Sequence, residues 1–197
     1  MLGITNRDRK AERREATRLE ILDAAWAVAR EQGLTQITLR EVADRVGMRA
    51  PSLYTHFDSK HAIYDAMFGQ AWSECLAIFE GVKDQAPDDG REALRFAART
   101  FFDFAVNDLP RHQLMNLRTI PGFEPSAEAY APAVATLDLA REVFACHGIT
   151  AQEDLDLYTA VVGGLVDSQQ ANDPGGERWS RLVDRAVDML ADTFDLP

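Results

Sequence analysis

Polar side chains that can hydrogen-bond to a nucleic acid gather near residue 54 of the sequence. They are Ser52, Tyr54, Thr55 and His56. Hydroxyl and imidazole groups can bond to both phosphate oxygens and base edges. Leu53, the apolar residue among them, is expected to turn inward and to leave these side chains facing outward or sideways. Hydrogen-bonded recognition in a DNA groove is therefore the chemistry that this segment predicts.

Two short helices joined at Gly47 are expected to position these side chains. The first begins at Thr38, whose hydroxyl can cap the free amides of the first turn. Its packed face is expected to consist of Val42, Ala43 and Val46. Gly47 can adopt the positive φ that a helix end commonly needs, which lets the chain turn into the second helix. Pro51 lies near the start of that helix, where its missing N–H costs nothing.

Four pieces of the sequence between Ile21 and about Phe68 follow the pattern of a known family. They read, in order, ILDAAWAVAREQG, TLREVADRVG, PSLYTHF and DSKHAIYDAM. In this order and at these spacings the segment resembles the tetracycline-repressor (TetR) family of bacterial transcription regulators. The resemblance implies an all-α fold, in which a three-helix DNA-binding head precedes a larger helical body for ligand binding and dimerisation.

The resemblance also implies DNA contacts for particular residues of the head. Thr38 and Tyr54 would donate hydroxyl hydrogen bonds to phosphate, and Lys60 would place a charge on the DNA backbone. Arg40 corresponds to an arginine that reads guanine, through a bidentate pair to O6 and N7. The remaining groove face would be formed by Arg49, Ala50, Pro51, Ser52, Thr55 and His56.

Some of these positions have alternative interpretations. Many relatives have a serine cap at the position of Arg49, and because arginine cannot accept an amide proton, we expect Arg49 to contact DNA instead. The Tyr54 ring could pack in the head core, and His56 could lie at the surface or in the core without a DNA role. A basic amino terminus could reach the minor groove or flanking phosphates, or be a solvated tail. Its basic residues are Arg7, Arg9, Lys10, Arg13 and Arg14.

The net charge of −11 is distributed unevenly along the 197 residues. Residues 1–60 contain 11 basic and 9 acidic residues, a net charge of +2, whereas the remainder contains 10 and 23, a net charge of −13. Screening over roughly 8 Å at physiological salt weakens repulsion between DNA and a distant acidic body. The acidic total therefore does not exclude binding of double-stranded DNA.

Other classes of protein lack support in the sequence. No apolar run approaches the roughly 20 residues of a membrane span, and no secretory signal follows the charged amino terminus, so we expect a cytoplasmic protein without a membrane partner. Cys75 and Cys146 lie far apart in the sequence, which favours reduced thiols over a disulfide. We find no phosphate loop, nucleophile elbow or His-Glu-x-x-His pair, and His61 with Asp65 is too little for a metal site. We therefore expect no enzyme activity, cofactor or metal.

The remainder of the sequence reads as helices. Helices are expected at about 14–32, 60–82, 91–106, 110–118, 126–147, 151–171 and 177–194. Pro132 would kink the helix at 126–147 or delay its start. With the two short helices, the fold has about nine helices in two domains, a DNA-binding domain at 1–58 with a basic amino-terminal arm and an effector-binding and dimerisation domain at 59–197.

The last two helices bear on the oligomeric state. Apolar or small residues share one face of the helix at 151–171, namely Leu157, Ala160, Val161, Gly164, Leu165 and Ser168. This face and that of the helix at 177–194 could pack on their own body. In the resembled family, however, the corresponding pair forms a four-helix bundle with a second copy, which implies a homodimer whose two heads bind two half-sites.

The resemblance further implies a body pocket for a small-molecule effector. The candidate walls are Trp72, Cys75, Phe79, Phe101, Phe104, Met115, Phe123, Tyr130 and Phe144, and His112 and Arg118 could orient a polar group. Any one of these side chains could instead be a core residue. The resulting hypothesis is a repressor that a small apolar or aromatic effector releases from a palindromic operator. The alternative is a ligand-independent architectural or activating DNA-binding protein.

Overall fold

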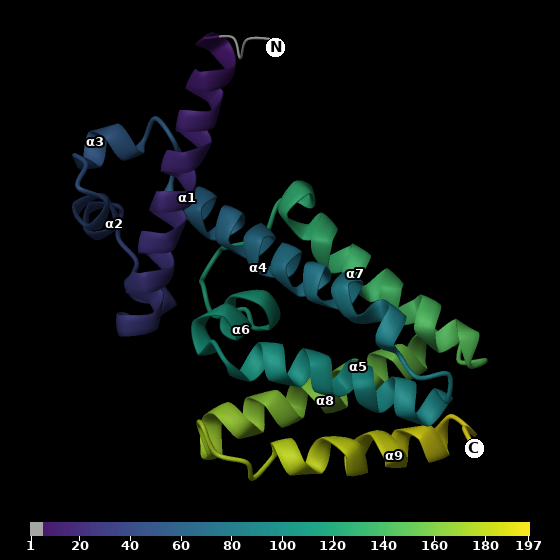
Figure 1. Cartoon of the computed structure of the whole chain (residues 1–197). Coiled ribbons are helices and arrows are strands. Elements are labelled where there is room, and N and C mark those ends of the chain that lie inside the picture. Colours follow the sequence, from purple (N-terminus) through teal and green to yellow (C-terminus); the bar gives the residue numbers. More distant parts are fainter. Residues whose placement is uncertain (1–5) are drawn as a thin grey trace.

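A computed structural model of the protein describes residues 6–197, with side chains from Arg9 onward. Within these residues the chain forms nine α-helices, three short 3-10 helices and no strand (Figure 1). The all-α fold predicted from the sequence is therefore confirmed. The α-helices are α1 (Asn6–Gln32), α2 (Leu39–Val46), α3 (Ala50–Leu53), α4 (Lys60–Val82), α5 (Gly90–Val106), α6 (Leu109–Asn116), α7 (Ala127–Cys146), α8 (Gln152–Asn172) and α9 (Val183–Thr193). The 3-10 helices are η1 (Leu34–Gln36), η2 (Lys83–Gln85) and η3 (Ser180–Leu182).

Helix α1 begins earlier than expected, at Asn6 and not near Arg14. The prediction relied on an apolar stripe, which the residues before Arg14 lack. Most of them are nevertheless Arg, Lys, Glu or Ala, whose intrinsic helix propensity is high. Residues 1–5 and the Arg7 side chain of the predicted arm lie outside the described part of the chain. From Asn6 onward the basic segment continues the helix, and Figure 1 shows α1 projecting beyond α2 and α3.

The segment after α1 forms the helix-turn-helix that the sequence predicts. The Thr38 hydroxyl accepts a hydrogen bond from the Glu41 amide at 3.2 Å and so caps α2. Gly47 ends α2 with φ of 76°, in the left-handed region that glycine adopts without steric cost. Arg49 precedes α3 without a side-chain cap, as expected for a residue that cannot accept an amide proton.

The head and the start of the body share one hydrophobic core. Leu53 on α3 is fully buried, in the same core cluster as Ile63 on α4 and Leu114 on α6. Two hydrogen bonds cross the same region: the Tyr64 hydroxyl donates to the Leu34 carbonyl at 2.6 Å, and Trp26 Nε1 donates to Gln70 Oε1 at 3.0 Å. The packing is therefore continuous across residues 58 and 59, and the domain boundary between them stays a prediction.

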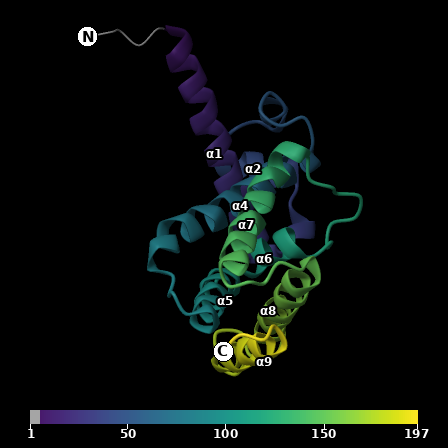
Figure 2. The ribbon, with the colours of Figure 1, turned by 90° about the vertical axis from the view of Figure 1, so that its right-hand side faces the viewer.

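The body has a second core farther from the head. Helix α7 runs alongside α4, while α5 packs against α8 and α9 (Figures 1 and 2). The second core is formed by α5, α7, α8 and α9, with Phe102, Phe144, Tyr158, Val166 and Val187 among its buried members. The Tyr158 hydroxyl is satisfied inside it by the Leu94 carbonyl at 2.7 Å. Two cores thus place α4 and α6 between the head and the distal helices.

One body helix starts where the sequence predicts it, and another starts later. Pro132 lies inside α7 without delaying it, because Ser126 caps the first turn and is itself held by Asp65 through bonds of 2.6 and 2.9 Å. The last helix was expected from Glu177, but α9 begins only at Val183. Gln169 explains the delay, since its buried side-chain oxygen accepts the amides of residues 179 and 180 and holds this segment as a turn.

An ionic ladder fixes α5 against α9. Its rungs are Arg91 with Asp192, Arg95 with Asp188, and Arg99 with Asp184. Both partners recur every four residues, which is close to one helical turn, and they run in opposite directions along the two helices. The ladder therefore sets an antiparallel register and turns the acidic stripe of α9 toward its own body.

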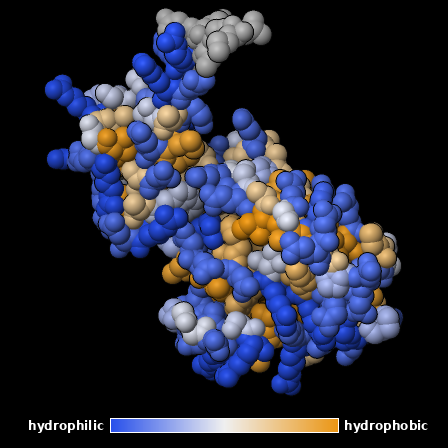
Figure 3. All heavy atoms as spheres, viewed as in Figure 1, coloured by the Kyte–Doolittle hydropathy of each residue, from blue (hydrophilic) through white to orange (hydrophobic). Residues whose placement is uncertain are grey.

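The surface is mainly hydrophilic on the face that Figure 3 shows, with separate apolar patches over the head and over the region of α4 and α7. Among the described residues, no helix combines the length and hydrophobicity that crossing a membrane requires.

Candidate nucleic-acid interface and ligand pocket

The outward surface of α3 carries the polar side chains that the sequence singled out. Leu53 is the inward anchor, and Ser52 and Thr55 are exposed. The Tyr54 side chain is also outside the core, with 52% of its surface exposed, which rules out the alternative that its ring packs inside. His56 is half-buried, and its Nδ1 atom has no hydrogen-bond partner among the described residues. The Thr55 hydroxyl donates to the Ser52 carbonyl at 2.7 Å, whereas the exposed Ser52 and Tyr54 hydroxyls form no hydrogen bond within the described residues and can approach a nucleic acid.

Two arginines flank this surface with their guanidinium groups in solvent. Arg40 on α2 is 88% exposed, and its contact with Asp44, one turn away, is long at 3.9 Å. An exposed pair of this kind contributes little and can be given up for a base or a phosphate. Arg49 is exposed beside Ala50 and Pro51 at the start of α3, and it forms no ion pair within the described residues. The Thr38 oxygen accepts from α2, so its hydroxyl hydrogen remains available as a donor.

Lys60 differs from the other predicted contacts, because it turns inward. Its ammonium donates to the Thr35 carbonyl at 2.9 Å and lies 5.4 Å from the centre of the Tyr64 ring. Partial burial lowers the pKa of Lys60. The expectation of an ammonium directed at the DNA backbone is not met in this conformation. A phosphate contact by Lys60 would compete with its bond to η1.

Two arginines of α1 hold the carboxyl end of α3: Arg14, which was expected in the basic arm, and Arg18, which was not singled out from the sequence. Arg14 donates to the Thr55 carbonyl at 3.3 Å, and Arg18 donates to the His56 carbonyl at 2.5 Å. Arg18 also lies over the Phe57 ring at 4.2 Å from its centre. Arg14 and Arg18 are four residues apart, which places both on one face of α1, and this spacing could have indicated from the sequence that they contact the same neighbouring segment. Arg14 therefore does not belong to a free arm, whereas Arg9, Lys10 and Arg13 are exposed.

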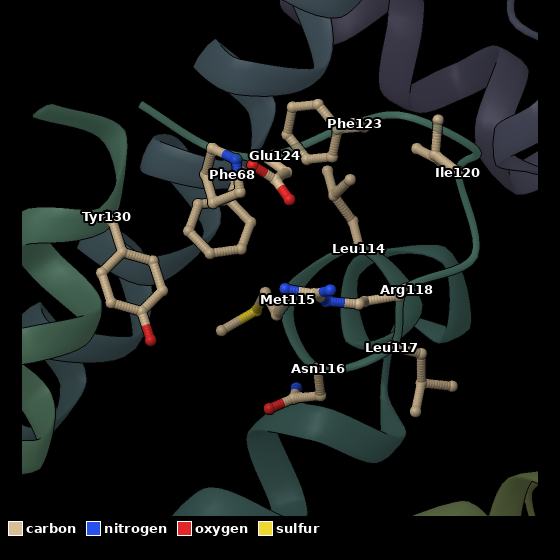
Figure 4. Close-up of a pocket in the computed structure, with 11 residues that line it drawn as sticks. Phe68, Leu114, Met115, Asn116, Leu117, Arg118, Ile120, Phe123, Glu124 and Tyr130 are labelled. Carbon is tan, nitrogen blue, oxygen red and sulfur yellow. The ribbon is translucent and has the colours of Figure 1, made fainter. Parts of the chain in front are cut away.

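A hollow of about 440 Å³ opens between α4, α6, α7 and the loop at 117–125. Its volume lies within the range of small-molecule sites. Four predicted pocket residues line it: Met115, Arg118, Phe123 and Tyr130. Its other lining residues were not predicted from the sequence; they are Phe68, Leu114, Asn116, Leu117, Ile120, Glu124 and Pro125. Figure 4 shows aromatic and charged side chains facing the same space.

The other predicted pocket residues do not line this hollow. Cys75 is buried in the first core, where desolvation raises the pKa of its thiol to about 12. His112 is buried on α6, with Nε2 at 2.8 Å from Asp167 Oδ1 on α8. Phe144 belongs to the second core and meets Tyr158 edge-on at 4.9 Å between ring centres. The remaining four pack in or against the first core: Trp72, Phe79, Phe101 and Phe104. Helical spacing identified these side chains as apolar but could not separate core from pocket.

A second hollow of about 350 Å³ lies on the head side of the same loop. It shares Arg118, Ile120, Phe123 and Glu124 with the first. His61, in the first turn of α4, lines this second hollow and lies 6.1 Å from the Phe123 ring between centres. The two hollows therefore meet at a common wall close to the base of the head.

The outward side of α8 is partly apolar. The residues that α8 buries are Leu155, Tyr158, Val162, Val166 and Gln169, whereas Leu157, Ala160 and Gly164 of the predicted stripe are exposed. This part of the stripe does not pack on its own body. On α9, Val183, Val187 and Leu190 face inward, and Met189 is 63% exposed. The described chain thus leaves four apolar or small residues uncovered, Leu157, Ala160 and Gly164 on α8 and Met189 on α9, which we call the uncovered apolar surface of α8 and α9.

Comparisons with known proteins point to one kind of relative. Residues 21–67 match the family described as bacterial regulatory proteins, tetR family. The chain is 28% identical to the class A tetracycline repressor protein from Escherichia coli over 186 residues, which are 89% of this chain and 79% of the relative. It is 33% identical over 104 residues to the HTH-type transcriptional activator FasR from Mycolicibacterium smegmatis, and the match spans 52% of this chain and 46% of that protein.

The fold has solved counterparts. The regulator FadR from Bacillus subtilis, whose crystal structure contains stearoyl-CoA, aligns with 87% of this chain and 96% of its own, at a TM-score of 0.70 and 17% identity. At this identity the likeness concerns the fold. Its extent shows that the body, as well as the head, follows an arrangement seen in solved regulators.

Proposed function

Since the chain belongs to the TetR family of transcriptional regulators, we propose that it represses genes by binding a palindromic operator as a homodimer, and that a small apolar or aromatic effector releases it. The chain is accordingly a DNA-binding regulator and not an enzyme. The observation that carries the proposal is the exposed surface of α2 and α3, with a buried anchor, Leu53, beneath it. The detailed contacts, the dimer and the release are our inferences.

We call the exposed surface of α2 and α3 the reading surface, and its residues would have different roles in DNA binding. Tyr54 and Thr38 would bind phosphate and set the orientation of the head, without reading sequence. Arg40 would discriminate guanine, for which a bidentate pair is worth roughly 1–3 kcal/mol. Arg14 and Arg18 would act indirectly, because they bond to the carbonyls at the end of α3 and hold Tyr54 and its neighbours in place.

Dimerisation would use the uncovered apolar surface of α8 and α9. Leu157 and Met189 are exposed on it, and Gly164 would allow a close approach of two helices. A two-fold axis through this surface would place two heads against two half-sites of an inverted repeat. The ionic ladder between α5 and α9 supports this choice, because it pairs the acidic stripe of α9 with arginines of the same chain.

Helix α6 offers a path between the hollow and the head. Its N-cap, Asp108, accepts bonds of 2.9 and 2.7 Å from Arg30 at the end of α1, while Leu114 and Met115 at its other end line the hollow. An effector that binds better when the heads are misplaced for DNA shifts the population toward that state. A hundredfold loss of operator affinity requires a difference of about 2.7 kcal/mol.

A second candidate function is an activating or ligand-independent DNA-binding protein. The observation that favours it is the match to a relative named as an activator. A promoter fusion separates the two hypotheses. If the protein is a repressor, deleting its gene should raise expression of a reporter fused to the regulated promoter. If it is an activator, reporter expression should fall.

Selection of genomic fragments by the purified protein, followed by sequencing, tests the proposal. We expect enrichment of an inverted repeat by the natural protein and none by an Arg40→Ala, Tyr54→Ala double variant with unchanged thermal unfolding. Absence of any enriched sequence, from protein that mass spectrometry shows to be free of small ligands, would contradict operator binding.

A further inference from the structure

The loop at 117–125 presents two charged side chains to the hollow without giving either a partner. Both residues are exposed, and within the described residues neither Arg118 nor Glu124 forms an ion pair or a side-chain hydrogen bond. Figure 4 shows both side chains reaching into the space that Phe68 and Tyr130 border. Elsewhere in the body, arginines mostly pair with acids, as Arg95 does with Asp188. The hollow therefore holds one unpaired positive and one unpaired negative group.

Apart from Asn116, the rest of the wall is aromatic or aliphatic. The Phe68 and Tyr130 rings are nearly parallel, 11° apart, with centres separated by 5.9 Å, and Phe123 meets Phe68 edge-on at 6.4 Å. The apolar part of the lining is completed by Leu114, Met115, Leu117, Ile120 and Pro125. Such a surface favours a flat or apolar body.

A wholly apolar ligand does not fit the charges. Where it covered Arg118 and Glu124, which are exposed in the free protein, it would remove water without replacing the lost hydrogen bonds, and an unpaired charge is costly to desolvate. The guanidinium fork matches a carboxylate or a phosphate group, to which it can bond bidentately. A carboxylate such as Glu124 only accepts, so its partner must be an N–H or O–H donor.

We propose that the effector carries both an anionic group and an amine on an apolar, preferably aromatic, body, with Arg118 binding the anion and Glu124 binding the amine. This inference rests on the proposed function, because it narrows the chemistry of the same pocket. A zwitterion of the aromatic amino-acid class supplies a partner for each of the two charges and an aromatic body for the apolar wall.

Four probes with one indole body test the proposal by isothermal titration calorimetry. They are tryptophan with both charges, indole-3-propionate with the acid alone, tryptamine with the amine alone, and 3-methylindole with neither. We expect tryptophan to bind at least tenfold more tightly than either singly charged probe, and 3-methylindole to bind most weakly.

Variants assign each charge to its residue. Arg118→Gln should reduce the affinity for tryptophan to that for tryptamine, and Glu124→Gln should reduce it to that for indole-3-propionate. Glu177→Gln and Arg178→Gln, which remove exposed charges of the same types in the turn before η3, should change neither. Equal binding of all four probes, or no binding at millimolar concentration, would overturn the proposal.

Measuring operator binding by the same protein preparations distinguishes failure of the charge assignment from failure of the proposed DNA-binding function. Protein that binds its operator but fails to discriminate among the probes refutes the charge assignment and leaves the DNA-binding function intact. Protein that binds no DNA refutes the proposed function itself.

Discussion

The head and the pocket loop treat their polar groups in opposite ways. In the head, Arg14, Arg18 and Lys60 donate to main-chain carbonyls, so the segments around α3 are held by their own chain. In the loop at 117–125, Arg118 and Glu124 face a hollow without partners in the described chain. The contrast suggests that the head is organised before it meets DNA, whereas the loop completes its polar bonds with a ligand. Five predictions can break or sharpen this comparison.

The largest effect is expected from the core under the reading surface. Leu53→Ala removes a fully buried side chain and should lower the free energy of unfolding by about 2–5 kcal/mol. Urea denaturation followed by circular dichroism measures this loss. Leu19→Ala, at a 47% exposed position on α1, is the matched control and should change stability by less than about 0.5 kcal/mol. Equal losses for the two variants would show that α3 is not anchored as described.

Removing the arginine that reads sequence should weaken specific binding. Arg40→Ala loses a bidentate contact, so discrimination against a changed half-site should fall by roughly 1–3 kcal/mol while stability stays constant. Fluorescence anisotropy with natural and base-substituted operator fragments measures this difference. If discrimination is unchanged, Arg40 does not read a base.

Loosening the end of α3 should affect both stability and DNA binding. Arg18→Met keeps an apolar stem over Phe57 but loses the bond to the His56 carbonyl, which should cost about 1–2 kcal/mol of stability. Operator affinity should fall as well, although Arg18 itself need not touch DNA. A variant that loses stability but retains full affinity would refute the idea that this bond organises the reading surface.

A single hydroxyl tests the phosphate contact. Tyr54→Phe should reduce affinity for operator and for random DNA alike, by about 1 kcal/mol, because phosphate contacts carry no sequence information. Tyr158→Phe is the matched buried control, since it should reduce stability and leave affinity unchanged.

The smallest test concerns the two thiols. Cys75 is buried and its pKa is raised to about 12, whereas Cys146 is exposed. Since the thiolate is the reactive form, a thiol reagent at pH 8 should modify one cysteine per native chain and both after denaturation. Rapid modification of Cys75 in the native protein would show that the core around α4 opens readily.

The sequence predicted the head better than the pocket for a physical reason. The signals at Thr38, Gly47 and Pro51 are local, because capping, a positive φ and a missing N–H each act within one turn. Whether Phe123 lines a hollow while Phe144 lies in a core depends on distant helices, and helical spacing contains no such information. The inward turn of Lys60 toward Thr35 is likewise a tertiary effect, across 25 residues of sequence.

The buried face of α8 also could not be predicted from helical spacing alone. The apolar stripe of α8 was visible in the sequence, yet the helix buries Tyr158 and Val162 and leaves Leu157 outside. Amphipathic spacing identifies a face but not the partner that covers it. The same holds for α5 and α9: the ion pairs between them identify which face of each helix contacts the other only once the two helices are placed side by side.

One titration tests the central claim most directly, that a preorganised head reads DNA and a charged pocket controls it. It measures anisotropy of the selected operator fragment, with and without the tightest-binding indole probe, for the natural protein and for Arg118→Gln. The account predicts tight binding of the operator by both proteins without probe, and release by the probe for the natural protein alone. Equal release of both proteins, or no effect of the probe on either, would contradict it.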